Sequence, residues 1–179
     1  MRIFLNYPSC RGFTLIELMM VVAVTAVLLG LAVPSFNALM ERQRLVATQN
    51  HLMAGFHYAR SLAVSTHAQA VICPSSDGLN CQTGGVWDSG WMIYVDRNRN
   101  GRRDADEAPQ RVERQPSGLR VRSSASRPQA VFRPNGGSGA SNLTLRLCSE
   151  SGQALGTLVL NNSGRLRKTV AADASGRCT

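Results

Sequence analysis

The longest apolar run of the chain lies near its N-terminus. No charged residue occurs from residue 18 to residue 40, and residues 13–16 extend the run in front. About 20 apolar residues are enough for a helix to cross a bilayer. A secretory signal peptide has a shorter apolar region, of roughly 7–15 residues, with its cleavage site behind it. The pattern therefore predicts a membrane-spanning helix over residues 13–36.

A second pattern continues the helix over residues 37–66. Pro34 removes one backbone hydrogen bond, which predicts a bend in the helix and not its end. Beyond it, five apolar residues at intervals of 7, 4, 3 and 4 fall on one helix face. They are Leu45, Leu52, Phe56, Ala59 and Ala63, and the opposite face holds Gln43, Asn50, His57 and Ser61. We expect one kinked helix from about Thr14 to about Ser65, whose second half is amphipathic and packs on a domain.

Residues 67–179 contain short β-like runs between clusters of Gly, Pro, Ser and Asn. Apolar and polar residues alternate most clearly in residues 119–122 and 143–147. The predicted strands are 70–73, 91–96, 110–114, 119–122, 130–133, 143–148, 157–160 and 166–170. Eight short strands at this spacing indicate antiparallel sheets, two of them packed on each other and on the helix. The predicted fold class is α+β.

Four of the five cysteines follow the apolar run, and Cys10 precedes it. The four allow three pairings. We favour Cys73–Cys81 and Cys148–Cys178, because each of these pairs closes the nearer loop. Disulfides of this kind form in an oxidising periplasm or outside the cell. The chain has no Cys-x-x-Cys pair and no two histidines four residues apart, so we expect no zinc site.

The segment from Asp96 to Glu107 fits the pattern D-x-[DN]-x-[DN]-G-x5-E of a calcium loop. Asp96, Asn98, Asn100 and Glu107 would supply the oxygen ligands. Gly101 would provide the sharp turn. Two features count against calcium: the flanks do not read as two helices, and four arginines in the loop offset its four acids. The alternative is a charged hairpin loop with Asx-type turns, so we predict no metal site and keep these residues only as calcium candidates.

Positive charge is concentrated in the C-terminal part of the chain. The formal net charge is +9, and residues 108–179 hold 11 basic and 3 acidic side chains. Ten of these 11 basic residues are arginine, whose planar guanidinium suits phosphate. The distribution favours an anionic partner, such as nucleic acid, lipid headgroups or an acidic surface. The alternative is that the charge only keeps the protein soluble.

Glu17 lies inside the apolar run, where a carboxylate is costly unless it is paired. Cleavage of the chain after Gly12 would create an N-terminal amine on Phe13, four residues before Glu17. The Glu17 carboxylate of a neighbouring copy can neutralise that amine. We therefore expect Glu17 to fix the register between subunits in an assembly.

The residues Arg11-Gly-Phe-Thr-Leu-Ile-Glu17 resemble the class III leader of type IV pilins and type II secretion pseudopilins. The resemblance implies that residues 1–12 are a leader, that a prepilin peptidase cuts between Gly12 and Phe13, and that Phe13 is N-methylated. Glu17 and Pro34 stand at the fifth and twenty-second positions after the cut, as in the family. It also implies a long helix on a β-rich domain. The expected location is the bacterial inner membrane, single-pass with a periplasmic domain, and then a filament shared with other pilins.

Within this family, the chain is similar to the FimT/GspH group in its size, its 91–96 strand and the loop that follows. FimT-like proteins are minor components of type IV pili, and some are linked to DNA uptake. GspH-like proteins belong to the type II secretion pseudopilus. Both alternatives stay open at this stage, whereas the leader argues against an unassembled membrane-anchored adhesin.

The segment Gly164-Arg165-Leu-Arg167 resembles a Gly-Arg-x-Arg element associated with DNA binding in transformation-linked FimT proteins. On a strand, Arg165 and Arg167 point to the same face, and we expect Lys168 beside them. Such side chains bind successive phosphates without reading bases. Aromatic residues are sparse here, so base stacking is not expected. The alternative is a solvated strand face beside a turn.

No enzyme signature occurs in the chain. The sequence has no G-x-S-x-G, no H-E-x-x-H and no G-x-x-x-x-G-K phosphate loop, and it suggests no cofactor. We therefore predict a structural and binding protein. The leading hypothesis is a FimT-like minor pilin whose basic C-terminal face binds DNA for natural transformation, and the alternative is a GspH-like pseudopilin.

Overall fold

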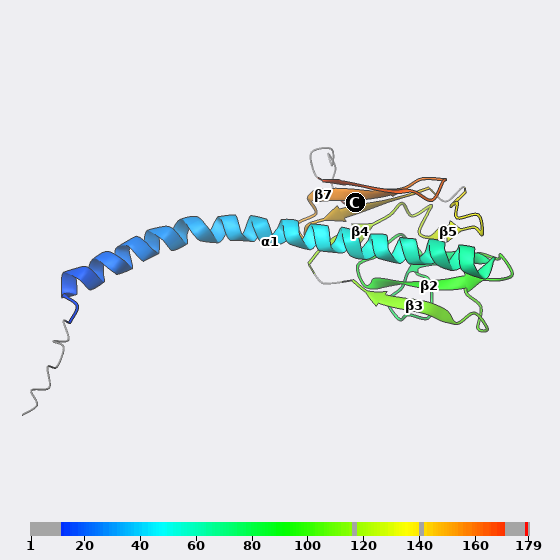
Figure 1. Cartoon of the computed structure of the whole chain (residues 1–179), viewed down its shortest axis with the longest axis horizontal. Helices are drawn as coiled ribbons and strands as arrows, with labels where there is room; N and C mark the ends of the chain where they lie inside the picture. The colour runs from blue at the N-terminus through cyan, green and yellow to red at the C-terminus, as the bar shows by residue number, and fades with distance from the viewer. Residues whose placement is uncertain (1–11, 116–117, 140–141, 171–177, 179) are drawn as a thin grey trace, which may run out of the picture. The chain divides into compact units, whose positions relative to one another are not determined.

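The computed structural model describes residues 12–115, 118–139, 142–170 and 178, with only the backbone described for residues 31–35 and 37–38. The chain forms two structural units, Met1–Met40 and Glu41–Thr179, and we describe each by itself. Figure 1 shows that the second unit contains all the strands, together with the C-terminal part of helix α1.

Helix α1 spans Leu15–Thr66, close to the predicted bounds. Thr14 caps its start, because its Oγ1 accepts a hydrogen bond from the Glu17 N–H at 3.3 Å. The helix ends at Thr66, and the next residue, His67, has a left-handed φ of 53°. The backbone stays helical through Pro34, and the expected bend there stays a prediction.

The helix of the first unit exposes its large apolar side chains. Phe13 is 86% exposed, and Leu29 near the other end of the apolar run is 58% exposed. Such a surface requires lipid or other protein to cover it. Within the part of the chain whose side chains the structure describes, no helix has both the length and the apolarity that crossing a membrane requires.

In the second unit, the helix packs through the face that the spacing predicts. The five predicted apolar residues are at most 3% exposed, and Gln43, Asn50, His57 and Ser61 face solvent. Gly55 lies on the buried face and lets the ring of Trp91 approach the helix closely. The amphipathic reading of this half of α1 is confirmed.

Two four-stranded antiparallel sheets accompany the helix. The first sheet has the order β3-β2-β1-β5 and the second has the order β4-β6-β7-β8. The strands of the first sheet are β1 (Gln69–Pro74), β2 (Gly90–Asp96), β3 (Pro109–Arg114) and β5 (Ala130–Phe132). Those of the second are β4 (Arg120–Arg122), β6 (Leu143–Cys148), β7 (Ala154–Leu160) and β8 (Leu166–Val170). All eight predicted strands are present, and the α+β class with two antiparallel sheets is confirmed.

The core lies between the helix and the inner faces of both sheets. Phe56 of α1 packs with Trp87 and Phe132, at ring-centroid distances of 6.0 Å and 6.4 Å. From the second sheet, alternate residues of β6 and β7 contribute leucines, among them Leu145 and Leu158. Because the pleat has a period of two, the residues between them face outward.

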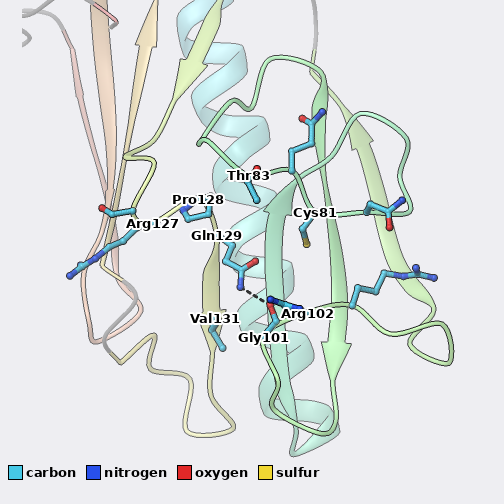
Figure 2. A pocket seen from close by; sticks show the side chains of 12 residues that line it. Cys81, Thr83, Gly101, Arg102, Arg127, Pro128, Gln129 and Val131 are labelled. Carbon is cyan, nitrogen blue, oxygen red and sulfur yellow. Dashed lines mark hydrogen bonds between the residues drawn. The ribbon is translucent and has the colours of Figure 1, made fainter.

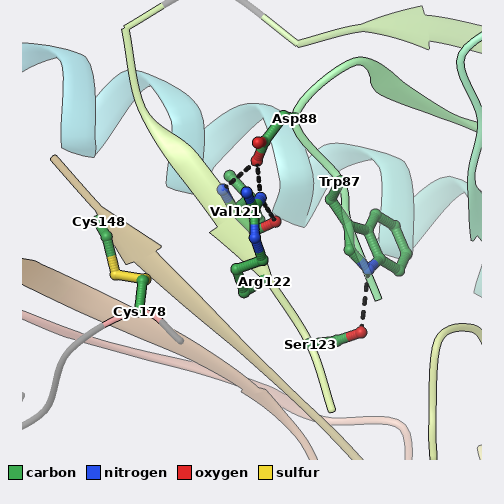
Figure 3. Close-up of polar contacts among 7 residues, drawn as sticks. All are labelled: Trp87, Asp88, Val121, Arg122, Ser123, Cys148 and Cys178. Atoms are coloured by element: carbon green, nitrogen blue, oxygen red, sulfur yellow. Dashed lines mark hydrogen bonds and ion pairs between the residues drawn. A yellow bond between two sulfur atoms is a disulfide. The ribbon is translucent and has the colours of Figure 1, made fainter. Parts of the chain in front are cut away.

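Two disulfides lie in the second unit. Cys73 pairs with Cys81 and Cys148 pairs with Cys178, with Cα–Cα distances of 5.5 Å and 6.2 Å. These are the two pairings that the loop lengths favoured. The second bridge ties residue 178 to the end of β6 (Figure 3). Cys10 lies outside the described residues.

Candidate nucleic-acid interface

The turn between β7 and β8 fixes the backbone at Arg165. The N–H of Asn161 donates to the carbonyl of Arg165 at 3.0 Å, and the N–H of Gly164 donates to the carbonyl of Asn161 at 2.9 Å. The side-chain oxygen of Asn161 accepts the N–H of Arg165 at 2.9 Å. The asparagine thus acts as an Asx-type brace. The base of the Arg165 side chain therefore has a defined position at the tip of the hairpin.

Gly164 is required for the packing of this turn. Its φ is +77°, and a Cβ at this position would collide with the carbonyl oxygen of Gly136. The loop that contains Gly136 is also held by Ser138, whose N–H donates to the Asn162 carbonyl at 3.0 Å. Arg60 of α1 donates to the Gly164 carbonyl at 3.3 Å. The absence of a side chain at Gly164 therefore serves its close packing against the backbone of Gly136.

Arg165 and Arg167 lie on the outer side of the second sheet. Arg167 pairs with Val159 across β7 and β8, and both residues alternate with core-facing neighbours. Arg165 precedes Arg167 by two residues and therefore lies on the same side. Both side chains are exposed. Arg167 lies on the outer side of β8 as expected, whereas Arg165 precedes the strand and its side follows only from the two-residue spacing.

Lys168 does not lie beside the two arginines, and this part of the expectation is wrong. It pairs with the buried Leu158. Its Nζ lies 3.4 Å from the side-chain oxygen of Asn50 on α1. Consecutive residues of a strand point to opposite faces, so Lys168 points toward the helix side. The exposed pair Arg165 and Arg167 therefore forms the cationic site without it.

No acidic side chain in the described strands of the second sheet neutralises the charge of Arg165 and Arg167. Within the described ranges, the ion pairs join His51 to Glu113, Arg111 to Glu113 and Arg122 to Asp88. None of the four strands of the second sheet contains Asp or Glu. Among the described strands of this sheet, no carboxylate therefore competes with a phosphate for Arg165 or Arg167.

Three arginines in the strands of this sheet, Arg120, Arg122 and Arg146, were not among the predicted site residues. Arg146 lies in the middle of β6, is exposed, and stands opposite Arg122 of β4. The clean alternation of residues 143–147 already implied that Arg146 points away from the core. What the sequence could not supply was its position relative to Arg167, which depends on the strand order.

In the loop from Asp96 to Glu107, the two terminal carboxylates bind backbone N–H groups. Buried Asp96 accepts from Asn100 at 3.2 Å and from Gly101 at 2.9 Å. Glu107 accepts from Arg97 at 2.8 Å and from Asp104 at 3.2 Å. Gly101 has a φ of +72°, which provides the sharp turn.

The two asparagines among the calcium candidates contact an acid of the same loop. The side-chain amides of Asn98 and Asn100 donate to Asp104 at 2.6 Å and 2.8 Å. In the described part of the chain, no three His, Cys, Asp or Glu side chains are arranged to hold a metal. The geometry favours the alternative of a hydrogen-bonded hairpin loop. Burial and the nearby Asp96 carboxylate raise the pKa of Tyr94 beneath it.

A hollow of about 620 Å³ opens beside this loop (Figure 2). Three arginines, Arg102, Arg103 and Arg127, line it together with amide and hydroxyl side chains, and no acid lines it. The Gln129 amide donates to the Gly101 carbonyl at 3.0 Å and ties two of its walls together. This hollow adds to the cationic character of the domain.

The cleavage site that the leader predicts lies before helix α1. Gly12 and Phe13 are exposed, and no heavy atom comes within 4 Å of a Cβ built on Gly12. Thr14 and Glu17 form the Thr-x-x-Glu pattern of a capping box, of which the Thr14 half is present. The Thr-x-x-Glu pattern is visible in the sequence. It places Glu17 in the first turn of the helix, and this is separate from the pairing proposed between its carboxylate and a neighbouring N-terminal amine.

Comparison with known protein families gives two matches. Residues 48–164 match the family described as "Type II transport protein GspH". Residues 7–33 match the "Prokaryotic N-terminal methylation motif". The chain is also 32% identical over 166 residues to the pilin-like protein PilA1 of Thermus thermophilus, covering 88% of this chain and 97% of PilA1.

Two solved structures share the fold. The type IV minor pilin FimU of Pseudomonas aeruginosa PAO1 superposes with a TM-score of 0.60 at 24% identity, over 78% of this chain and 98% of FimU. GspH of E. coli superposes with a TM-score of 0.52 at 20% identity, over 75% of this chain and 93% of GspH. At these identities the likeness concerns the fold alone.

Proposed function

We propose that this chain, which belongs to the family of type IV pilins and GspH-type pseudopilins, is a minor pilin that binds DNA through Arg165 and Arg167. Proteins of this family are structural and not enzymes. They are anchored in the membrane and are then assembled into filaments. The role we assign to this member is the capture of DNA for uptake in natural transformation.

The N-terminal part prepares the subunit for assembly. A prepilin peptidase removes residues 1–12 by cutting between Gly12 and Phe13, and Phe13 is then N-methylated. The match of residues 7–33 to the methylation motif supports this step, as does the exposure of both residues before the helix. Residues 13–36 hold the subunit in the inner membrane and later join the filament, with the domain of residues 67–179 in the periplasm.

Glu17 selects the position of the subunit among other pilins. Its carboxylate neutralises the N-terminal amine of a neighbouring subunit, which makes burial of both charges tolerable. The exposed apolar side chains around it, such as Ile16 and Leu18, supply the rest of that contact. Residues 37–66 then connect this assembly region to the globular domain.

One observation carries the DNA proposal. Arg165 and Arg167 project from the outer side of the second sheet, and none of its strands carries an acidic residue. Two guanidinium groups on one side of a hairpin suit adjacent phosphates, with hydrogen bonds that carry no base information. Because the contacts are to phosphates, binding must weaken as salt rises.

The test is a titration of the full chain, in nonionic detergent, with a duplex of random sequence at several salt concentrations. Arg165→Gln/Arg167→Gln is compared with Arg114→Gln, an exposed arginine on β3 of the first sheet. The double variant is expected to bind less tightly and to reduce the slope of log K against log salt by about 1.8, for two phosphates. Equal affinity of the double variant and the wild type would reject the assignment, as would binding that does not depend on salt.

A GspH-like pseudopilin is the second candidate function, because the matched family over residues 48–164 is described as a type II transport protein. A gene deletion separates the two. Loss of transformation with normal secretion of exoproteins is expected for the minor pilin. Loss of secretion with normal transformation would favour the pseudopilin instead.

A further inference from the structure

The side of the second sheet that faces away from the core, here called the outer face, is mostly polar and basic, with the apolar Val159 among its residues. Six of its residues are Arg122, Thr144, Arg146, Thr157, Arg167 and Thr169. All six are exposed or half-buried. The strands β4, β6, β7 and β8 contain no Phe, Tyr, Trp or His. The outer face therefore offers charge and hydroxyl groups, and no surface on which a base could stack.

The strand register places these groups in two rows across the sheet. In one row, Arg122 stands opposite Arg146, and Arg146 stands opposite Thr157. In the next row, Thr144 stands opposite Val159, which stands opposite Arg167. Arg146 and Arg167 are thus two strands apart and displaced by two residues. With strands about 4.8 Å apart and about 3.4 Å per residue, their Cα atoms are separated by about 12 Å.

Of the two arginines in the first row, Arg146 is the better placed to bind a phosphate. Arg122 forms an ion pair with Asp88, and its Nη1 also donates to the Val121 carbonyl (Figure 3). Two like charges directly opposite each other are unfavourable, and the Asp88 carboxylate relieves this. The Arg146 side chain makes no hydrogen bond or ion pair with any residue that the structure describes.

A hollow of about 390 Å³ lies beside Arg146 and is lined by hydroxyl groups. Its walls include Ser123, Ser124 and Thr144, together with Arg122 and Cys178 of the second disulfide. The Thr144 side chain is exposed on the outer face next to Arg146. Guanidinium and hydroxyl groups together are the usual side-chain donors to phosphate oxygens of DNA.

We propose that Arg146, with the hydroxyl groups beside it, is a second phosphate-binding point. The DNA backbone then crosses the outer face from Arg165 and Arg167 toward Arg146. This inference rests on the proposed DNA-binding function and extends it from a hairpin tip to a track across the sheet. The separation of about 12 Å equals the axial rise of three to four nucleotides, so the two points hold different phosphates.

The chemistry of the track determines which form of DNA it binds. A face without aromatic rings cannot gain affinity from unstacked bases. Its contacts are to the backbone, which carries no sequence information. The ligand is therefore duplex DNA bound without sequence preference.

The test compares Arg146→Gln with Arg146→Lys and with Arg114→Gln, in the full chain in nonionic detergent, by titration with a 30-base-pair duplex at several salt concentrations. Arg146→Gln is expected to weaken binding and to lower the salt slope by about 0.9, the value for one phosphate. Arg146→Lys keeps the charge and should retain the slope, and Arg114→Gln should behave as the wild type. Circular dichroism of each variant checks that the fold is kept.

The outcomes separate the two proposals. If the wild type binds no duplex, both the DNA-binding function and the track are rejected. If Arg165→Gln/Arg167→Gln weakens binding but Arg146→Gln leaves affinity and salt slope unchanged, the hairpin site stands and the track is rejected. An equal loss in Arg114→Gln also rejects the track, because net charge would then explain the effect.

Discussion

His51 of helix α1 lies 3.0 Å from Glu113 of strand β3, measured from Nε2 to Oε2. Glu113 also pairs with Arg111 on the same strand, at 2.5 Å. The His51 ring packs against Trp91, with centroids 4.6 Å apart. These contacts attach an edge strand of the first sheet to the helix.

The first prediction concerns pH. The hydrogen bond from Arg111, and then that from His51, holds the pKa of Glu113 below its ordinary value. A carboxyl group with a lowered pKa stabilises the fold above its unfolded pKa, and this contribution is lost as pH falls through the folded value. We expect Glu113→Gln to lower the free energy of unfolding by about 1 kcal/mol at pH 7 and by less at pH 3.5, which lies below the unfolded glutamate pKa of about 4.3.

Urea unfolding at both pH values measures this difference. Glu150→Gln is the control, because Glu150 is exposed in a turn and forms no ion pair with the described residues. The same loss for Glu113→Gln at pH 7 and at pH 3.5 would contradict the role given to the Glu113 carboxylate.

The second prediction concerns Gly55. Alanine is normally better than glycine inside a helix, by about 1 kcal/mol. A Cβ at Gly55 would come 2.7 Å from Nε1 of the buried Trp91, so the packing there must shift. We expect Gly55→Ala to destabilise the domain by about 1–3 kcal/mol in chemical denaturation. Gly30→Ala places the same substitution in the same helix with nothing within 4 Å and should not destabilise it.

The third prediction concerns Gly164. Gly164→Ala places a methyl group against the Gly136 carbonyl and strains a φ of +77°. We expect a loss of stability of at least about 1 kcal/mol, and weaker DNA binding although both arginines remain. Gly152→Ala has a comparable φ of +86° but open space around it, so it isolates the cost of the backbone angle. Equal stability losses in the two variants would show that the contact with Gly136 contributes nothing.

The elements of the fold were readable from the sequence because each has a local cause. The spacing of Leu45, Leu52 and Phe56 set the buried helix face, and short β-like runs between turn residues marked all eight strands. The cysteine pairs followed from loop length. Strand order did not follow, because β5 pairs with β1 and β4 pairs with β6 across long stretches of chain.

The candidate site was only partly readable, for the same reason. Arg165 and Arg167 were found from a short pattern and from strand alternation. Lys168 was misplaced, because its side chain faces α1, and only the packing of the sheet on the helix shows which side that is. The role of Gly164 depends on Gly136, which lies 28 residues earlier and meets it through tertiary contact.

The sequence by itself therefore determined the family, the expected cleavage between Gly12 and Phe13, the helix, the strands and the excess of arginine. These properties depend on residues that are close together in the chain. The tertiary structure decided which arginines share a surface, since Arg146 and Arg167 meet on one face only through the order β6-β7-β8. Register between strands arises from side-chain packing across the whole sheet, which no short segment encodes.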